Sequence, residues 1–207
     1  MKYKSPFNPE QQAGDLPAKI VAGLERISEA FKVLLWEKAK EFGLSPIQIR
    51  LLIFVAYHPP DSCTISQLAL EFNITKPTIS DAVRVLEEKG LIGKIPSATD
   101  SRSYSIGLSV AGQHIVSETQ AFTDPLTSLV AGFPPMQQAS FFEMLSKLIY
   151  SLNRHGVLTV QRTCFACRFY EKRPMGDYCG LLEKTLFPAD IRIDCPEFSS
   201  QGSSSRQ

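Results

Sequence analysis

The sequence lacks several features that would place the chain in a functional class at once. Its 207 residues contain no apolar run approaching the length of a membrane span, so we expect no membrane-spanning segment. The first fifteen residues contain no apolar core and do not resemble a secretory signal, so we expect a cytoplasmic location. A glycine-rich phosphate loop and a Ser/His/Asp order are also missing, so we expect no enzymatic activity.

A strong excess of charge is missing as well. The chain carries 22 basic and 21 acidic residues, a formal net charge of +1, so bulk charge does not indicate a nucleic-acid partner. Any such function must be argued from the local pattern of residues. Hydrophobic residues make up 43% of the chain, which excludes a mainly disordered protein and favours one globular domain with a small appendage.

Proline, glycine and cysteine divide the chain into four predicted segments. Residues 1–15 are polar and are predicted to form a flexible arm, and residues 199–207 a disordered tail. Residues 16–158 contain apolar residues at helical spacing, including two long amphipathic helices predicted at 17–42 and 135–154. Residues 161–198 contain four of the five cysteines and are predicted to form a separate small module.

Two short helices and a hairpin are predicted in the middle of the chain. Thr64 begins a capping box before a helix at 66–72, and Thr75 can cap a second helix at 76–89. The residues at 91–95 and 104–108 then favour two strands joined by a turn-rich tip. This order is typical of a winged helix–turn–helix that reads DNA, and the alternative is a small helical bundle with a hairpin.

The chain resembles the MarR family of winged-helix regulators in four segments: FNITKPTIS at 72–80, LEEKGLI at 86–92, DSRS at 100–103 and LSVAG at 108–112. The resemblance covers about residues 17–155. It implies a mainly α fold with a small β-hairpin, in which helices at both ends of the domain join two copies into a homodimer. It also implies double-stranded DNA as the partner, and a small-molecule effector, if there is one, between the dimer helices and the winged domain.

The predicted DNA contacts lie on the second short helix and at the tip of the hairpin. The outward face of that helix is polar and basic, as a helix in the major groove of DNA requires. The hairpin tip has one arginine that could contact the DNA backbone or enter the minor groove. The candidate residues are Thr75, Lys76, Pro77, Thr78, Ser80, Asp81, Arg84 and Arg102.

The late cysteines are the candidate metal ligands. The pattern is Cys164-x2-Cys167-x11-Cys179-x15-Cys195, and four thiolates can form a tetrahedral zinc site. About 35 residues bury too little surface to fold alone, so a bound metal would stabilise the module. We expect zinc; an iron–sulfur cluster is the main alternative, and metal-free thiols or disulfides are another. Cys63 is expected to be a buried or idle thiol.

Overall fold

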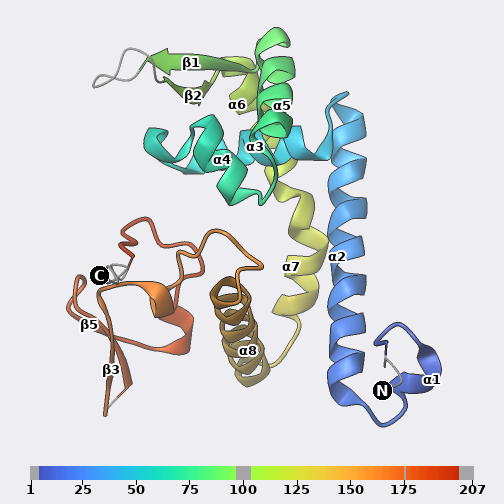
Figure 1. The fold of residues 1–207 in the computed structure, drawn as a ribbon, viewed down its shortest axis with the longest axis vertical. Coiled ribbons are helices and arrows are strands. Elements are labelled where there is room, and N and C mark those ends of the chain that lie inside the picture. Colours follow the sequence, from blue (N-terminus) through green and yellow to red (C-terminus); the bar gives the residue numbers. More distant parts are fainter. Residues whose placement is uncertain (1–4, 97–103, 175, 201–207) are drawn as a thin grey trace. The chain divides into compact units, whose positions relative to one another are not determined.

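The structure is a computed structural model that describes residues 5–96, 104–174 and 176–200. The chain forms two compact units, each made of several stretches of sequence. The first unit comprises residues 1–57, 82–93 and 107–125, and the second comprises 58–81, 94–106 and 126–207. Figure 1 shows the helices and strands of both units.

The first unit is helical. Helix α2 is the longest element, and Asp15 begins it by accepting a hydrogen bond from the backbone N–H of Ala18 at 3.0 Å. Helix α3 contacts both α2 and α6, and its buried side chains include Ile49, Leu51 and Leu52. The elements that lie wholly in this unit are α1 (Pro9–Gln12), α2 (Leu16–Glu41), α3 (Pro46–Tyr57), α6 (Val110–Thr119) and η2 (Gln120–Thr123).

The helix–turn–helix consists of α4 (Ile65–Glu71) and α5 (Lys76–Glu88). The 3₁₀ helix η1 (Pro60–Ser62) precedes it. Asn73 turns the chain between α4 and α5 with a φ of 55°, a conformation that asparagine tolerates better than most residues. Strands β1 (Ile92–Pro96) and β2 (Tyr104–Leu108) pair into the two-stranded sheet that follows α5 (Figure 1).

The remaining elements of the second unit lead into the cysteine segment. Helices α7 (Asp124–Ala131) and α8 (Pro135–Arg154) are followed by a small antiparallel sheet in the order β3–β4–β5. In its register, Tyr170 lies opposite Cys179, and Cys179 lies opposite Lys184. The elements of the segment are η3 (Cys164–Ala166), β3 (Tyr170–Arg173), β4 (Gly176–Cys179), β5 (Lys184–Leu186) and η4 (Pro188–Asp190).

Helices α2 and α8 each expose many large apolar side chains. On α2 the exposed set includes Phe31 at 42% and Trp36 at 52%, and on α8 it includes Met144 at 62% and Leu148 at 40%. Large exposed apolar side chains that gather on one element are typical of an interface with another chain. No helix in the described part of the chain is long and apolar enough to cross a bilayer.

The predicted fold class is confirmed: the fold is mainly α with a winged helix–turn–helix and a small hairpin. Two details at the ends of the chain were wrong. Residues 9–12 of the predicted arm form the short helix α1, because the side chain of Asn8 caps it. Ser199 and Ser200, predicted as part of the tail, are held by the cysteine segment: the Arg168 N–H donates to the Ser199 carbonyl at 2.8 Å, and Ser200 pairs with Cys167. The tail residues 201–207 lie outside the described residues.

Candidate functional site

Helix α5 has one buried face and one exposed face. The Thr75 hydroxyl caps the helix by accepting from the backbone N–H of Thr78 at 3.4 Å, as the sequence predicts. The amphipathic pattern sends every predicted inward side chain into the core, because apolar residues recur at three- and four-residue steps. Those side chains, all less than 9% exposed, are Ile79, Ala82, Val83 and Leu86.

The exposed face of α5 presents seven of the eight predicted DNA contacts. These residues lie at or near the N-terminal half of the helix and are all exposed: Thr75, Lys76, Pro77, Thr78, Ser80, Asp81 and Arg84. Arg84 forms an ion pair with Glu88, with 2.9 Å between Nη1 and Oε1. Both side chains of this pair are about 60% exposed, so it contributes little to stability.

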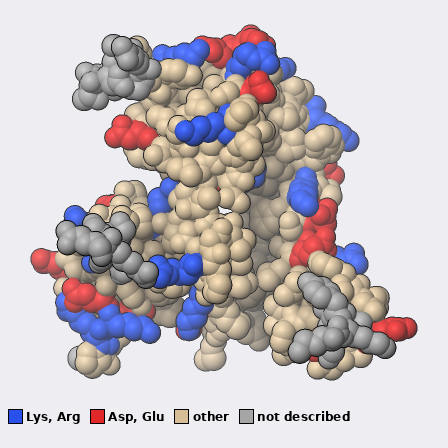
Figure 2. Space-filling view, in the orientation of Figure 1, with Lys and Arg blue, Asp and Glu red and all other residues tan. Residues whose placement is uncertain are grey.

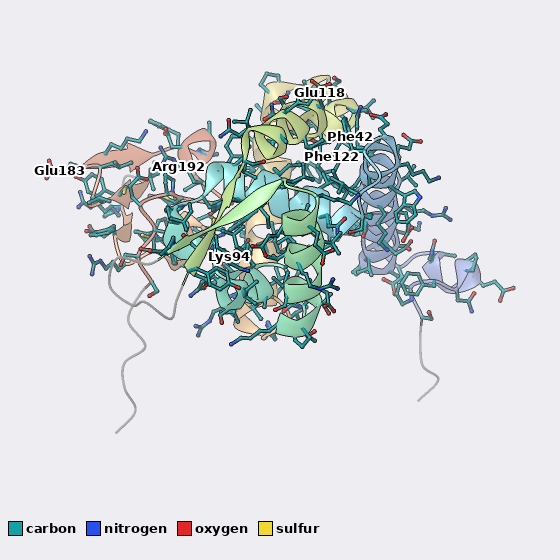
Figure 3. The ribbon with its side chains drawn as sticks, turned by 90° about the horizontal axis from the view of Figure 1, so that it is seen from above. Phe42, Lys94, Glu118, Phe122, Glu183 and Arg192 are labelled. Carbon is teal, nitrogen blue, oxygen red and sulfur yellow. The ribbon has the colours of Figure 1, made fainter. Side chains whose placement is uncertain are left out.

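The hairpin supplies a second basic element. The ammonium of Lys94 on β1, a residue labelled in Figure 3, lies over the ring of Tyr104 on β2, 5.3 Å from its centroid, in a cation–π contact. The Ile106 N–H on β2 donates to the Cys63 carbonyl at 2.9 Å, which ties the hairpin to the segment that enters α4. Arg102, the predicted contact at the tip of the hairpin, lies outside the described residues.

Charge on α5 is unevenly distributed. In Figure 2 basic and acidic side chains lie side by side at the end of the view where α5 is drawn, without a patch of one sign. The helix carries Lys76 and Arg84 toward its start and middle, whereas Glu87 and Glu88 lie at its C-terminal end. Asp81 offsets the charge of Lys76 within the first half of α5, so a polyanion would be attracted only at the Lys76 end and repelled at the C-terminal end.

The four late cysteines line one small cavity. Cys164 and Cys167 come from η3 and its C-cap, Cys179 ends β4, and Cys195 follows the last 3₁₀ helix. The rest of the wall is mostly apolar and consists of Phe169, Tyr170, Leu181, Leu182, Leu186 and Glu197. The fold thus brings together all four predicted ligands, which are up to 31 positions apart in the sequence.

The structure does not group these cysteines as the ligands of one metal ion. Among residues 5–96, 104–174 and 176–200, no group of three or more histidine, cysteine or acidic side chains is arranged to hold a metal ion. All five cysteines are free thiols, so the segment is not held together by a disulfide. The backbone N–H of Arg192, a residue labelled in Figure 3, donates to the Cys164 sulfur at 3.3 Å.

Arg162 connects the cysteine segment to the helix–turn–helix. Its guanidinium lies 2.6 Å from the Glu71 carboxylate at the end of α4 and 2.5 Å from the carboxylate of Asp194, the neighbour of Cys195. The ring of His58 also bonds Asp194, with 2.8 Å between Nε2 and Oδ2. Burial by itself raises the pKa of Asp194, but the hydrogen bonds and charges of Arg162 and His58 outweigh it and hold the pKa below its usual value.

Two further hydrogen bonds link the chain before the first late cysteine to the helix–turn–helix. The Asn73 side chain, in the turn between α4 and α5, donates to the Val157 carbonyl at 3.3 Å. The Thr159 hydroxyl donates to the Leu70 carbonyl on α4. Sequence reasoning missed this network, because its members are scattered along the chain and share no motif; the only signal was that Arg162 and Asp194 each lie near a predicted ligand.

A separate hollow of about 510 Å³ lies in the first unit, along the inner side of α2. Its walls combine apolar side chains of α2 with Arg50 of α3 and Phe122 of η2. Figure 3 labels Phe122. An apolar hollow with a few polar groups is typical of a small-molecule site.

The two short helices, the turn at Asn73 and the hairpin define a winged helix–turn–helix protein. Within this class, residues 42–103 match the sequence model of the MarR family. Of the described elements, that stretch contains α3, η1, the helix–turn–helix and β1. This part of the chain is therefore similar to the MarR family.

Solved structures of similar proteins have the same winged helix–turn–helix fold. The protein in the MepR–DNA complex from Staphylococcus aureus is 28% identical, with a TM-score of 0.54 over 62% of this chain and 94% of that one. S. aureus MepR in its DNA-binding conformation is 27% identical, with a TM-score of 0.58 over 64% of this chain and 98% of that one. The transcriptional regulator PA3341, at 24% identity and a TM-score of 0.57 over 65% and 98%, shares the fold.

Proposed function

We propose that this protein is a dimeric transcriptional regulator that binds double-stranded DNA in a sequence-specific manner. The observation that carries the proposal is the exposed face of α5, where polar and basic side chains follow a capped helix start while the opposite face is fully buried. This is the arrangement that a recognition helix needs in a major groove. The relatives whose structures are described as a DNA complex and as a DNA-binding conformation give it independent support.

The exposed apolar faces of α2 and α8 support the homodimer, because a second copy would cover them. Two copies would place two α5 helices on the two halves of a pseudo-palindromic site. The hollow along α2 supports a small apolar effector. The four cysteines lining one cavity support a metal centre in the C-terminal segment, of which zinc is the simplest form.

The proposal is tested on a DNA duplex that the protein selects from a random pool. Arg84→Ala should weaken binding by about 1–3 kcal/mol if Arg84 contacts a base, or lower the salt slope by about one unit if it contacts a phosphate. Binding is measured by fluorescence anisotropy at several salt concentrations. Arg173→Ala is the matched control, because Arg173 is also an exposed arginine paired with a glutamate, Glu171, but lies on β3. Equal affinities and slopes for the Arg84 variant and the wild type would remove Arg84 from the interface.

The Arg162 network favours a second candidate function, in which the cysteine segment controls DNA binding. Arg162 contacts α4 at Glu71 while Asp194 precedes Cys195, so a rearrangement at the cysteines reaches the helix–turn–helix through two ion pairs. DNA affinity is compared between metal-loaded and metal-stripped protein. If removing the metal changes the DNA affinity of the wild type, and this change is lost in Arg162→Gln but kept in Arg173→Gln, the cysteine segment controls DNA binding through Arg162. Identical DNA affinities of the metal-loaded and metal-stripped wild type contradict this function.

A further inference from the structure

We propose that a cavity of about 700 Å³ between α8 and the cysteine segment binds a neutral aromatic compound that carries a carbonyl group. The cavity lies wholly within the second unit and shares no residue with the hollow along α2. Small-molecule sites commonly have volumes of about 300–1,000 Å³, with mostly apolar and aromatic walls and a few polar groups. The inference does not depend on the DNA-binding function proposed above.

One stripe of α8 forms the first wall of the cavity. A helix brings residues three and four positions apart onto one face, and the lining residues of α8 follow that spacing. They are Phe142, Glu143, Ser146, Lys147, Tyr150 and Ser151. The exposed Met144 and Leu148 do not line the cavity, so the site and the proposed dimer interface use different side chains of the same helix.

The opposite wall is one face of the small sheet. Asp177 on β4 lies opposite both Lys172 on β3 and Leu186 on β5, so these three side chains share a face. Tyr170 lies two positions before Lys172 and therefore on the same face. Its ring meets the ring of Phe165 edge to face, with 5.4 Å between the centroids. The wall is completed by Pro188 and Ile191.

The charges around the cavity are balanced. Lys147 forms an ion pair with Glu143, with 2.5 Å between Nζ and Oε1, and Lys172 lies opposite Asp177. Glu143, Lys147 and Lys172 are exposed, whereas the aromatic and aliphatic side chains Phe142, Tyr150, Phe165 and Leu186 are half-buried or buried. Two basic and two acidic groups leave no net charge to attract an ion, so the walls favour a flat, neutral, mostly apolar ligand.

The Ser146 hydroxyl supplies the polar group of the site. Ser146 is 0% exposed, and its Oγ has no hydrogen-bond partner among the described residues. A serine inside a helix can donate to the carbonyl four residues earlier, but this one does not, so its buried hydroxyl costs free energy until an acceptor reaches it.

A second hydroxyl lies in the opposite wall. The Tyr170 oxygen is also buried without a hydrogen-bond partner in the part of the chain that the structure describes. Burial, and after it the nearby Asp177 carboxylate, raise the pKa of Tyr170, so the phenol keeps its proton and is a donor at neutral pH. Hydroxyl donors in apolar surroundings select a ligand that has an acceptor and no charge, and a carbonyl oxygen is the simplest such group.

The test uses the full-length chain and prodan, a neutral naphthyl ketone whose emission moves to shorter wavelength in apolar surroundings. Prodan should bind saturably with this shift, and a lack of saturable binding would overturn the site. Acetylnaphthalene and ethylnaphthalene, which differ only in the carbonyl, then compete with the bound probe. The ketone should displace prodan at a concentration about 3–10-fold lower. Equal displacement by both compounds would overturn the role of the carbonyl.

A serine variant locates the probe. Ser146→Ala should weaken prodan binding by about 3–10-fold and also raise the urea midpoint of the unliganded protein, because it removes a buried hydroxyl that has no partner. Ser140→Ala is the matched control, since Ser140 is an exposed serine of α8 that does not line the cavity, and it should change neither value. Wild-type affinity in Ser146→Ala would place the probe elsewhere, for example along α2, and overturn the proposal. A lower urea midpoint in this variant would show that the hydroxyl already has a partner, which would also overturn it.

Discussion

Arg162→Leu should weaken the attachment of the cysteine segment to the helix–turn–helix. The guanidinium contacts Glu71 at 2.6 Å and Asp194 at 2.5 Å, so a single substitution removes both ion pairs. The side chains of Arg162 and Glu71 are each 22% exposed, and that of Asp194 is 45% exposed. The Glu71 carboxylate would then lose its charged partner in a largely dehydrated position, whereas Asp194 would keep water and His58.

The expected magnitude lies between two limits. Exposed ion pairs contribute about 0.2–1 kcal/mol, and removing one partner of a fully buried pair costs about 3–5 kcal/mol. At one-fifth exposure for two of the three groups, we expect Arg162→Leu to lower the free energy of unfolding by about 1–3 kcal/mol. Urea unfolding at fixed protein concentration measures this loss, and limited proteolysis near residue 160 reports where the chain opens.

A double-mutant cycle isolates the Arg162–Glu71 pair. Arg162→Leu, Glu71→Gln and the double variant should be non-additive, with a coupling free energy of about 0.5–3 kcal/mol. Arg173→Leu is the control, because its pair with Glu171 is about half exposed and should cost less than about 1 kcal/mol. Single effects that add to within about 0.5 kcal/mol in the double variant would refute the coupling between the segment and α4.

Three other substitutions test the fold and the assembly. Gly112→Ala should destabilise the protein by about 1–3 kcal/mol in urea unfolding, since the added Cβ would lie 2.0 Å from the Leu91 carbonyl oxygen. An unchanged midpoint would contradict the close contact between α6 and the chain that follows α5. Burial raises the pKa of the Cys63 thiol from 9.0 to about 11, so the stability that the buried thiol contributes is fully present below pH 9 and is lost as the pH rises toward 11, by about 2–3 kcal/mol. Cys63→Ala should therefore flatten the plot of unfolding free energy against pH between pH 9 and about 11. Equal plots for the variant and the wild type would refute the burial argument. Leu148→Asp, on the exposed apolar face of α8, should shift the dimer toward monomer in analytical ultracentrifugation, and an intact dimer would exclude that face from the interface.

The sequence by itself determined the local structure. The spacing of apolar residues predicted α8 at its observed bounds, because a helix places every third or fourth side chain on one face. The hydroxyls of Thr64, Thr75 and Ser109 cap the helices that follow them, since each accepts a nearby backbone N–H within its own turn. The same helical repeat predicted which side of α5 would face DNA, and that side is exposed in the structure.

Tertiary structure alone decided what depends on contacts between distant residues. The spacing of the four cysteines suggests a metal site but fixes no distance between Cys164 and Cys195, so only the fold could show sulfurs placed around a cavity. The ion pairs of Arg162 reach Glu71, which is 91 positions away, and no periodicity or motif specifies such a pair. Such a pair depends on the packing of apolar faces that brings its two elements together, because neither residue's local sequence names its partner.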